Sequence, residues 1–122
     1  MKRIFKEKTI TAYHGTTDKG FRTYTYTYYT SDLAYAQEYS DDQGRIRTVE
    51  ITINNPFIIE GKYMGPGAII VNNRIIGFYR QLESETVDIL IREGYDGIIV
   101  NYNGIEAFEI IPFNDSQVVE QD

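Results

Sequence analysis

Ala12-Tyr13-His14-Gly15-Thr16-Thr17 contains the only histidine of this 122-residue chain. Polar and apolar residues alternate from Thr9 to Tyr13, as they do in a half-buried strand, so His14 is expected at a strand end. Gly15 can adopt a positive φ and lets a ligand approach main-chain N–H and C=O groups. Taken alone, the stretch favours an ordinary hydrogen-bonded strand residue before a plain turn, and only the later motifs suggest a site.

The composition is that of one ordinary globular domain spanning residues 1–122, with 42% hydrophobic and 25% charged residues. The chain has no cysteine and one histidine, so we expect no disulfide and no metal centre. The net charge of -6 argues against a broad surface for nucleic acid. No apolar run reaches the roughly 20 residues of a membrane span, and no signal-peptide core follows Met1. We therefore expect a cytoplasmic protein, of a host or target cell, without a membrane partner.

The most unusual composition lies between Phe21 and Thr30, where threonine and tyrosine alternate strictly from Thr23 to Tyr28 and predict a strand. The period changes at Ser31, an expected N-cap, and a short helix is predicted from Asp32 to Tyr39. Ala36 and Tyr39 share one face of that helix. Tyr28 and Tyr39 could be two walls of a flat slot for a planar heterocycle, but the spacing alone favours simple packing of helix on sheet.

Strands outnumber helices in the rest of the chain. We predict strands at 45–53, 57–59, 98–102 and 105–111, a helix at 84–93, a loop at 61–67, a hairpin turn at Asn103-Gly104 and a fraying tail from Val119. The segment 68–79 is either a hairpin turning at Asn72-Asn73 or a helix. The fold class is therefore α+β, with a mostly antiparallel, split β-sheet and a few short helices.

Five motifs follow one another along the chain: Tyr13-His14-Gly15-Thr16-Thr17, Tyr28 to Tyr39, Asn54-Asn55-Pro56, Gly94-Tyr95-Asp96-Gly97-Ile98, and Phe108 to Phe113 with Gln117-Val118. In this order they resemble the ADP-ribosyltransferase fold of the His-Tyr-Glu type, which includes diphtheria toxin and the poly-ADP-ribose polymerases. The small transferase domains of phage polyvalent proteins look most alike. Each motif alone is weak, but together they cover most of the chain.

The resemblance implies an enzyme of the glycosyltransferase class. Such a mono-ADP-ribosyltransferase cleaves its substrate NAD at the nicotinamide–ribose bond and transfers ADP-ribose to a macromolecular acceptor, here expected to be a protein rather than nucleic acid. The resemblance implies that the enzyme needs no metal ion. A toxin or phage effector fits the proteins that look most alike.

The resemblance also implies roles for individual residues, with Glu109, His14 and Tyr28 as the catalytic group. His14 would bind the adenosine ribose, and Gly15 would bind the nicotinamide carboxamide through its backbone. Tyr28 and Tyr39 would stack on the nicotinamide ring. Glu109 would bind the 2'-hydroxyl of the nicotinamide ribose and stabilise the cation that forms as nicotinamide leaves.

Three further positions belong to the implied NAD site. Thr16 would add a ribose contact, and Arg22 is the expected cation near the pyrophosphate. Ala36 stands where many polymerases carry a serine that binds the carboxamide. Between the two nearby carboxylates we choose Glu109 over Glu106, because only Glu109 keeps the family's interval to Gln117-Val118; the plain alternative for Glu109 is a solvated strand residue.

Two other functions remain open at this point. In an NAD glycohydrolase water would replace the acceptor, and a catalytically inactive module would bind NAD, ADP-ribose or a protein through the tyrosine face. The RNA 2'-phosphotransferases use a related fold, but the basic residues on which they rely are not found in this sequence.

Overall fold

The protein folds as an α+β chain of mostly antiparallel strands with a few short helices, as expected. The computed structural model describes residues 8–15, 26–39, 46–61, 67–102 and 104–121. In chain order the elements are β1 (Lys8–Gly15), α1 (Leu33–Tyr39), β2 (Ile46–Ile53), β3 (Pro56–Gly61), β4 (Ala68–Val71), β5 (Arg74–Phe78), α2 (Ser84–Arg92), β6 (Gly97–Tyr102), β7 (Ile105–Pro112), a short 3-10 helix (Asp115–Gln117) and β8 (Val118–Gln121).

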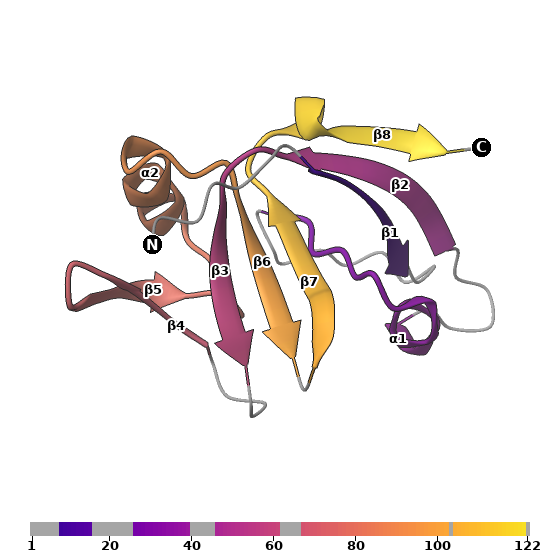
Figure 1. Ribbon diagram of the computed structural model, residues 1–122, viewed down its shortest axis with the longest axis horizontal. Helices are drawn as coiled ribbons and strands as arrows, with labels where there is room; N and C mark the ends of the chain where they lie inside the picture. The colour runs from indigo at the N-terminus through magenta and orange to yellow at the C-terminus, as the bar shows by residue number, and fades with distance from the viewer. Residues whose placement is uncertain (1–7, 16–25, 40–45, 62–66, 103, 122) are drawn as a thin grey trace.

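The strands form three sheets, two of them three-stranded (Figure 1). One has the order β1-β2-β8 and the other the order β3-β6-β7, while β4 and β5 form a separate hairpin. All paired strands are antiparallel except β3 and β6, which run parallel. Figure 1 shows α1 beside β1 and β7, and α2 above the hairpin at the opposite end of the molecule.

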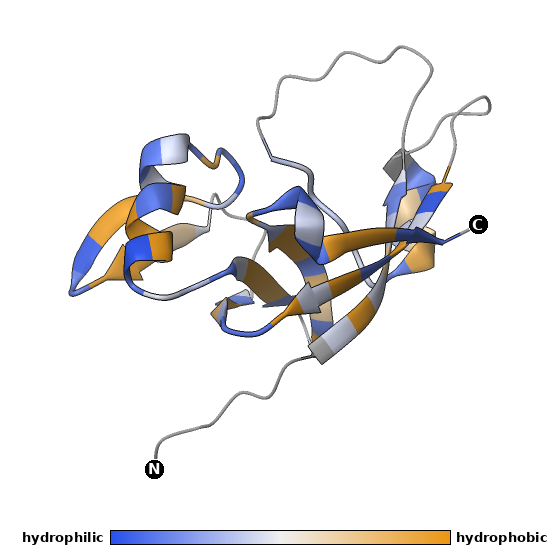
Figure 2. Ribbon diagram, turned by 90° about the horizontal axis from the view of Figure 1, so that it is seen from above, coloured by the Kyte–Doolittle hydropathy of each residue, from blue (hydrophilic) through white to orange (hydrophobic). Residues whose placement is uncertain are grey.

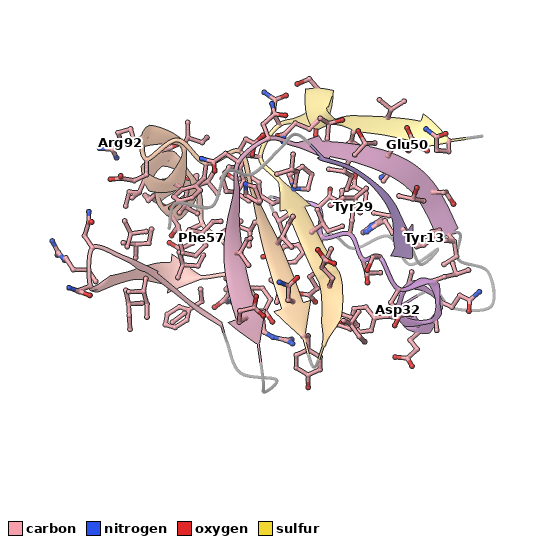
Figure 3. The ribbon with its side chains drawn as sticks, viewed as in Figure 1. Tyr13, Tyr29, Asp32, Glu50, Phe57 and Arg92 are labelled. Atoms are coloured by element: carbon pink, nitrogen blue, oxygen red, sulfur yellow. The ribbon has the colours of Figure 1, made fainter. Side chains whose placement is uncertain are left out.

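A two-residue segment joins the two larger sheets. Thr30 exchanges backbone hydrogen bonds of 2.7 and 2.9 Å with Tyr13 of β1, and Tyr29 exchanges bonds of 2.9 and 2.8 Å with Ile110 of β7. Figure 3 accordingly shows Tyr29 between these two strands. The predicted strand from Phe21 to Thr30 is wrong over residues 26–28, which are not in a strand, and residues 21–25 lie outside the described part of the chain. Tyr26 and Tyr28 instead pack against the apolar core that contains Leu90 of α2.

The strand β7 separates two apolar cores, because successive side chains of a strand point to opposite faces. Ile110 packs with Tyr29 and the buried residues of β1 and β2. Ile111 packs on the other face with Leu90 of α2 and the base of the hairpin. In Figure 2 apolar residues recur along the strands and the hairpin. Glu109 shares the face of Ile111, so a carboxylate on this strand has an apolar surrounding.

Three local expectations need correction or completion. Residues 68–79 form the hairpin β4–β5, and Asn72 and Asn73 at its turn have φ values of 52° and 63°, as a type I′ turn requires. The expected fraying tail is instead β8, because Val118 and its successors pair with β2. The N-cap of α1 is Asp32, whose Oδ1 accepts the Tyr35 N–H at 3.2 Å; the Ser31 hydroxyl donates to the Glu106 carbonyl at 3.1 Å.

A group of hydrogen bonds around Asp96 ties together motifs that lie far apart in the sequence. The two carboxylate oxygens of Asp96 accept the backbone N–H groups of Asn54 and Asn55 at 2.8 and 2.9 Å. Gln117 donates to the carbonyls of Asp96 and Thr52 at 2.9 and 3.2 Å. We call Asn54, Asn55, Asp96 and Gln117 the clasp. Three of the five motifs quoted above therefore have a structural explanation.

Candidate functional site

Glu109 is the only acidic residue among the buried residues of the described chain, with 8% of its surface exposed. Its Oε1 accepts a hydrogen bond of 3.4 Å from the Tyr35 hydroxyl of α1. Its Oε2 is buried and has no hydrogen-bond partner among the described residues. An ionisable oxygen buried without a partner is costly, and in a native protein it calls for an explanation such as a ligand or a catalytic role. Glu106, the rival carboxylate, is exposed.

A β-bulge explains why the two glutamates differ. The register of β6 and β7 shifts between Val100 and Tyr102, and Ala107 has a φ of 55° that L-residues seldom adopt. The Asn101 side chain stabilises the bulge by accepting the Ala107 N–H at 2.8 Å. Bulges are common next to active sites, where they redirect a side chain. Here the irregularity precedes Glu109 by two residues.

The Tyr79-Arg80 segment, which follows β5, interacts with Glu109 electrostatically. Burial raises the pKa of Glu109, while the positive charge of Arg80 and the Tyr35 hydroxyl lower it in part, so the net pKa shift is upward. Burial also raises the pKa of Tyr79, and the charge of Glu109 adds to that rise. The Arg80 guanidinium carbon lies 5.6 Å from the centre of the Tyr79 ring, within cation–π range.

The Tyr79 ring packs directly against the backbone of Gly67. The φ of Gly67 is +70°, and a Cβ built there would lie 1.8 Å from Cε1 of Tyr79. The Tyr79 N–H also donates to the Gly67 carbonyl at 2.9 Å. Only glycine permits both the backbone conformation and this close approach, so the position of the tyrosine depends on it.

Tyr28 connects this segment to His14. Its hydroxyl donates to the Tyr79 carbonyl and accepts the Leu82 N–H at 3.3 Å. Its own carbonyl oxygen lies 2.9 Å from Nδ1 of His14. Because a carbonyl only accepts, we assign the ring proton of His14 to Nδ1. Hydrogen bonds thus run from His14 through Tyr28 to the Tyr79-Arg80 segment, which interacts with Glu109 electrostatically.

The remaining predicted residues are placed as follows. Gly15 is the last residue of β1 and pairs with Ile46, and Ala36 is buried in α1 with 2% exposure. Thr16, Arg22 and the side chain of Tyr39 lie outside what the structure describes.

No group of three or more histidine, cysteine or acidic residues in the described ranges is arranged to hold a metal ion. Neither described helix has the length and apolar character needed to cross a membrane.

Three residues at this site were missed by the sequence analysis: Tyr35, Tyr79 and Arg80. Tyr35 lies four positions before Tyr39 on the predicted helix, so helical spacing is the signal that could have indicated it. Tyr79 and Arg80 follow a segment whose secondary structure the sequence left open. No pattern in the sequence indicated that they approach Glu109.

Comparisons of the chain with protein-family models, curated proteins and solved structures found no match. The function must therefore be argued from the site itself.

Proposed function

We propose that the protein is a mono-ADP-ribosyltransferase that cleaves NAD and transfers ADP-ribose to a macromolecule, preferably a protein. The observation that carries the proposal is Glu109: a carboxylate in an apolar surrounding, with one oxygen engaged by Tyr35 and the other buried without a partner among the described residues. A ribose hydroxyl is a suitable donor for that oxygen, since it is neutral and makes a single directed hydrogen bond.

The reaction requires negative charge where a cation develops. The bond between the ribose C1' and the nicotinamide nitrogen breaks, nicotinamide leaves with the electron pair, and the sugar becomes an oxocarbenium-like cation. In our proposal the 2'-hydroxyl of that ribose donates to Oε2 of Glu109, and the carboxylate stabilises the cation. An acceptor nucleophile then forms a bond to C1' and gives its proton to the solvent.

The other residues would bind NAD. His14 would contact the adenosine ribose, Gly15 the carboxamide, and Tyr28 the nicotinamide ring, as the resemblance implies. The hydrogen bonds from His14 through Tyr28 to the Tyr79-Arg80 segment, whose charge acts on Glu109, support assigning these residues to one site. The two three-stranded sheets joined by Tyr29 and Thr30 support the ADP-ribosyltransferase-like split sheet as part of the same proposal.

The test begins with the wild-type protein, NAD and a cell lysate. Mass added to a target together with released nicotinamide is expected. Nicotinamide release without a modified target would favour the NAD glycohydrolase. Saturable NAD binding with no release would favour the inactive binding module, and an absence of both would overturn the proposal.

Two matched substitutions on β7 assign the catalytic carboxylate. Glu109→Gln keeps the shape of the side chain but removes its charge, and we expect nicotinamide release to fall by about 100-fold. Glu106→Gln makes the same chemical change at an exposed position and should leave the release rate unchanged. Equal rates for wild type and Glu109→Gln would remove Glu109 from its assigned role.

A further inference from the structure

Tyr35 holds a position that suits it to orient Glu109. Its hydroxyl lies 3.4 Å from Oε1 of that residue, while its ring packs on Phe108 with the ring centres 4.5 Å apart. Phe108 in turn packs on Tyr102 at 5.5 Å. The ring is therefore held by an aromatic row, independently of its hydroxyl. Such packing restricts the rotamer and directs the polar tip of the tyrosine at the carboxylate.

The start of α1 is attached to the same strand as Glu109. The Ser31 N–H donates to the Ala107 carbonyl at 3.3 Å, and the Ser31 hydroxyl donates to the Glu106 carbonyl at 3.1 Å. Asp32 caps the helix by accepting the N–H of Tyr35 itself. These bonds fix the start of α1 to the backbone of Ala107 and Glu106, two and three residues before Glu109. The backbone therefore holds Tyr35 close to the Glu109 carboxylate.

The groups that face Glu109 come from two other elements. Tyr35 belongs to α1, and Tyr79 and Arg80 follow β5. Arg80 and Tyr35 favour the ionised carboxylate, whereas burial opposes it. Tyr35 contributes through a directed contact at Oε1, which leaves Oε2 available for a ligand.

We propose that Tyr35 is a positioning residue for Glu109: its hydroxyl holds Oε1 so that the ionised Oε2 is presented to the ribose hydroxyl. This inference rests on the proposed function. Tyr35 does not touch the reacting atoms, and it acts through the orientation and charge of the glutamate.

The test is Tyr35→Phe, which removes only the hydroxyl and keeps the stacking on Phe108. We expect kcat for nicotinamide release to fall about tenfold, the size of one hydrogen bond to a charged group, with little change in KM for NAD. The acid limb of the kcat–pH profile should move to higher pH, because a carboxylate without this donor takes up a proton more readily. Thermal unfolding should stay close to that of wild type.

Tyr95→Phe is the matched control. Tyr95 also packs on a phenylalanine, with its ring centre 5.2 Å from that of Phe57, on the face of the molecule that carries α2. Its kcat and pH profile should equal those of wild type. A Tyr35→Phe protein with an unchanged kcat and an unchanged acid limb would overturn the inference.

A second measurement separates this inference from the proposed function. The side-chain carboxyl of Glu109 can be titrated by carbon-13 NMR without any substrate, and its pKa should be higher in Tyr35→Phe than in wild type. A wild-type protein that releases no nicotinamide would overturn the enzymatic proposal, and the titration would still report whether Tyr35 controls the charge of Glu109. An identical titration in both proteins would overturn the positioning role.

Discussion

Two carboxylates of this protein stand in opposite situations. Asp96 is half-buried, and each of its oxygens accepts a backbone N–H, from Asn54 and Asn55. Glu109 is almost fully buried, with one long bond from Tyr35 and an oxygen that lacks a partner among the described residues. Both oxygens of Asp96 accept hydrogen bonds from the chain, whereas one oxygen of Glu109 accepts none from the described residues.

Asp96 is a motif residue that builds the fold, whereas Glu109 has an oxygen available to a ligand. A carboxylate that accepts a hydrogen bond at each oxygen stabilises the native state, because these bonds are lost on unfolding. A buried carboxylate with an unused acceptor destabilises it, and proteins keep such groups at functional sites. Both residues belong to the motifs that suggested a family, yet only Glu109 has a buried oxygen that the described residues leave unused.

The largest effect on stability is expected for Asp96→Ala. This change leaves the N–H groups of Asn54 and Asn55 without their acceptor, and since solvent can replace part of that bonding, we expect a loss of about 2 kcal/mol in the free energy of unfolding. Chemical denaturation measures it. Asp96→Asn retains one acceptor oxygen and should lose about half as much. Nicotinamide release per folded molecule should stay at the wild-type level in both; a strong decrease would mean that the clasp also belongs to the site.

A somewhat smaller effect on stability is expected for Asn101→Ala, a substitution that should also change turnover. The Ala107 N–H, on a residue that is only 4% exposed, would lose its acceptor, and we expect a loss of about 1 kcal/mol in the free energy of unfolding. Turnover should fall as well, because the bulge orients the strand before Glu109. Glu60→Gln is the control. The Asn101 amide donates to the Glu60 carboxylate at 2.9 Å, and glutamine keeps an acceptor there, so stability and turnover should both stay at the wild-type level.

The smallest effect concerns pH and the cost of keeping Glu109 ionised. Its folded-state pKa is raised above the ordinary value of 4.5, so the native state holds its proton more tightly than the unfolded chain. The stability that this proton gives is fully present below pH 4.5 and is lost as the pH rises through the folded-state pKa. Thermal unfolding of Glu109→Gln should therefore match wild type near pH 4 and exceed it increasingly toward pH 8. A constant difference across that range would contradict an unfavourable buried charge.

Local patterns were sufficient for several elements. Alternation predicted β1 and β2, the turn signal Asn103-Gly104 predicted the strand that follows it, β7, and apolar periodicity ending at Gly94 predicted α2. These features depend on neighbours along the chain, so a sequence contains them directly. The same reasoning failed for Tyr26 to Tyr28 and for the residues after Val119. The C-terminal residues pair with β2, and the Tyr28 hydroxyl bonds to Tyr79 and Leu82, so in both places groups far away in the sequence decide the conformation.

Sequence patterns predicted the α+β fold class, and the interval to Gln117-Val118 in the family that the chain resembles favoured Glu109 over Glu106. Folding brings the Tyr35 hydroxyl and the charge of Arg80 to that glutamate, and it forms the bulge at Ala107 that separates Glu109 from its exposed neighbour. The reason is physical. Burial and the electric field at a side chain are sums over groups brought together by folding, and no spacing along one strand specifies them.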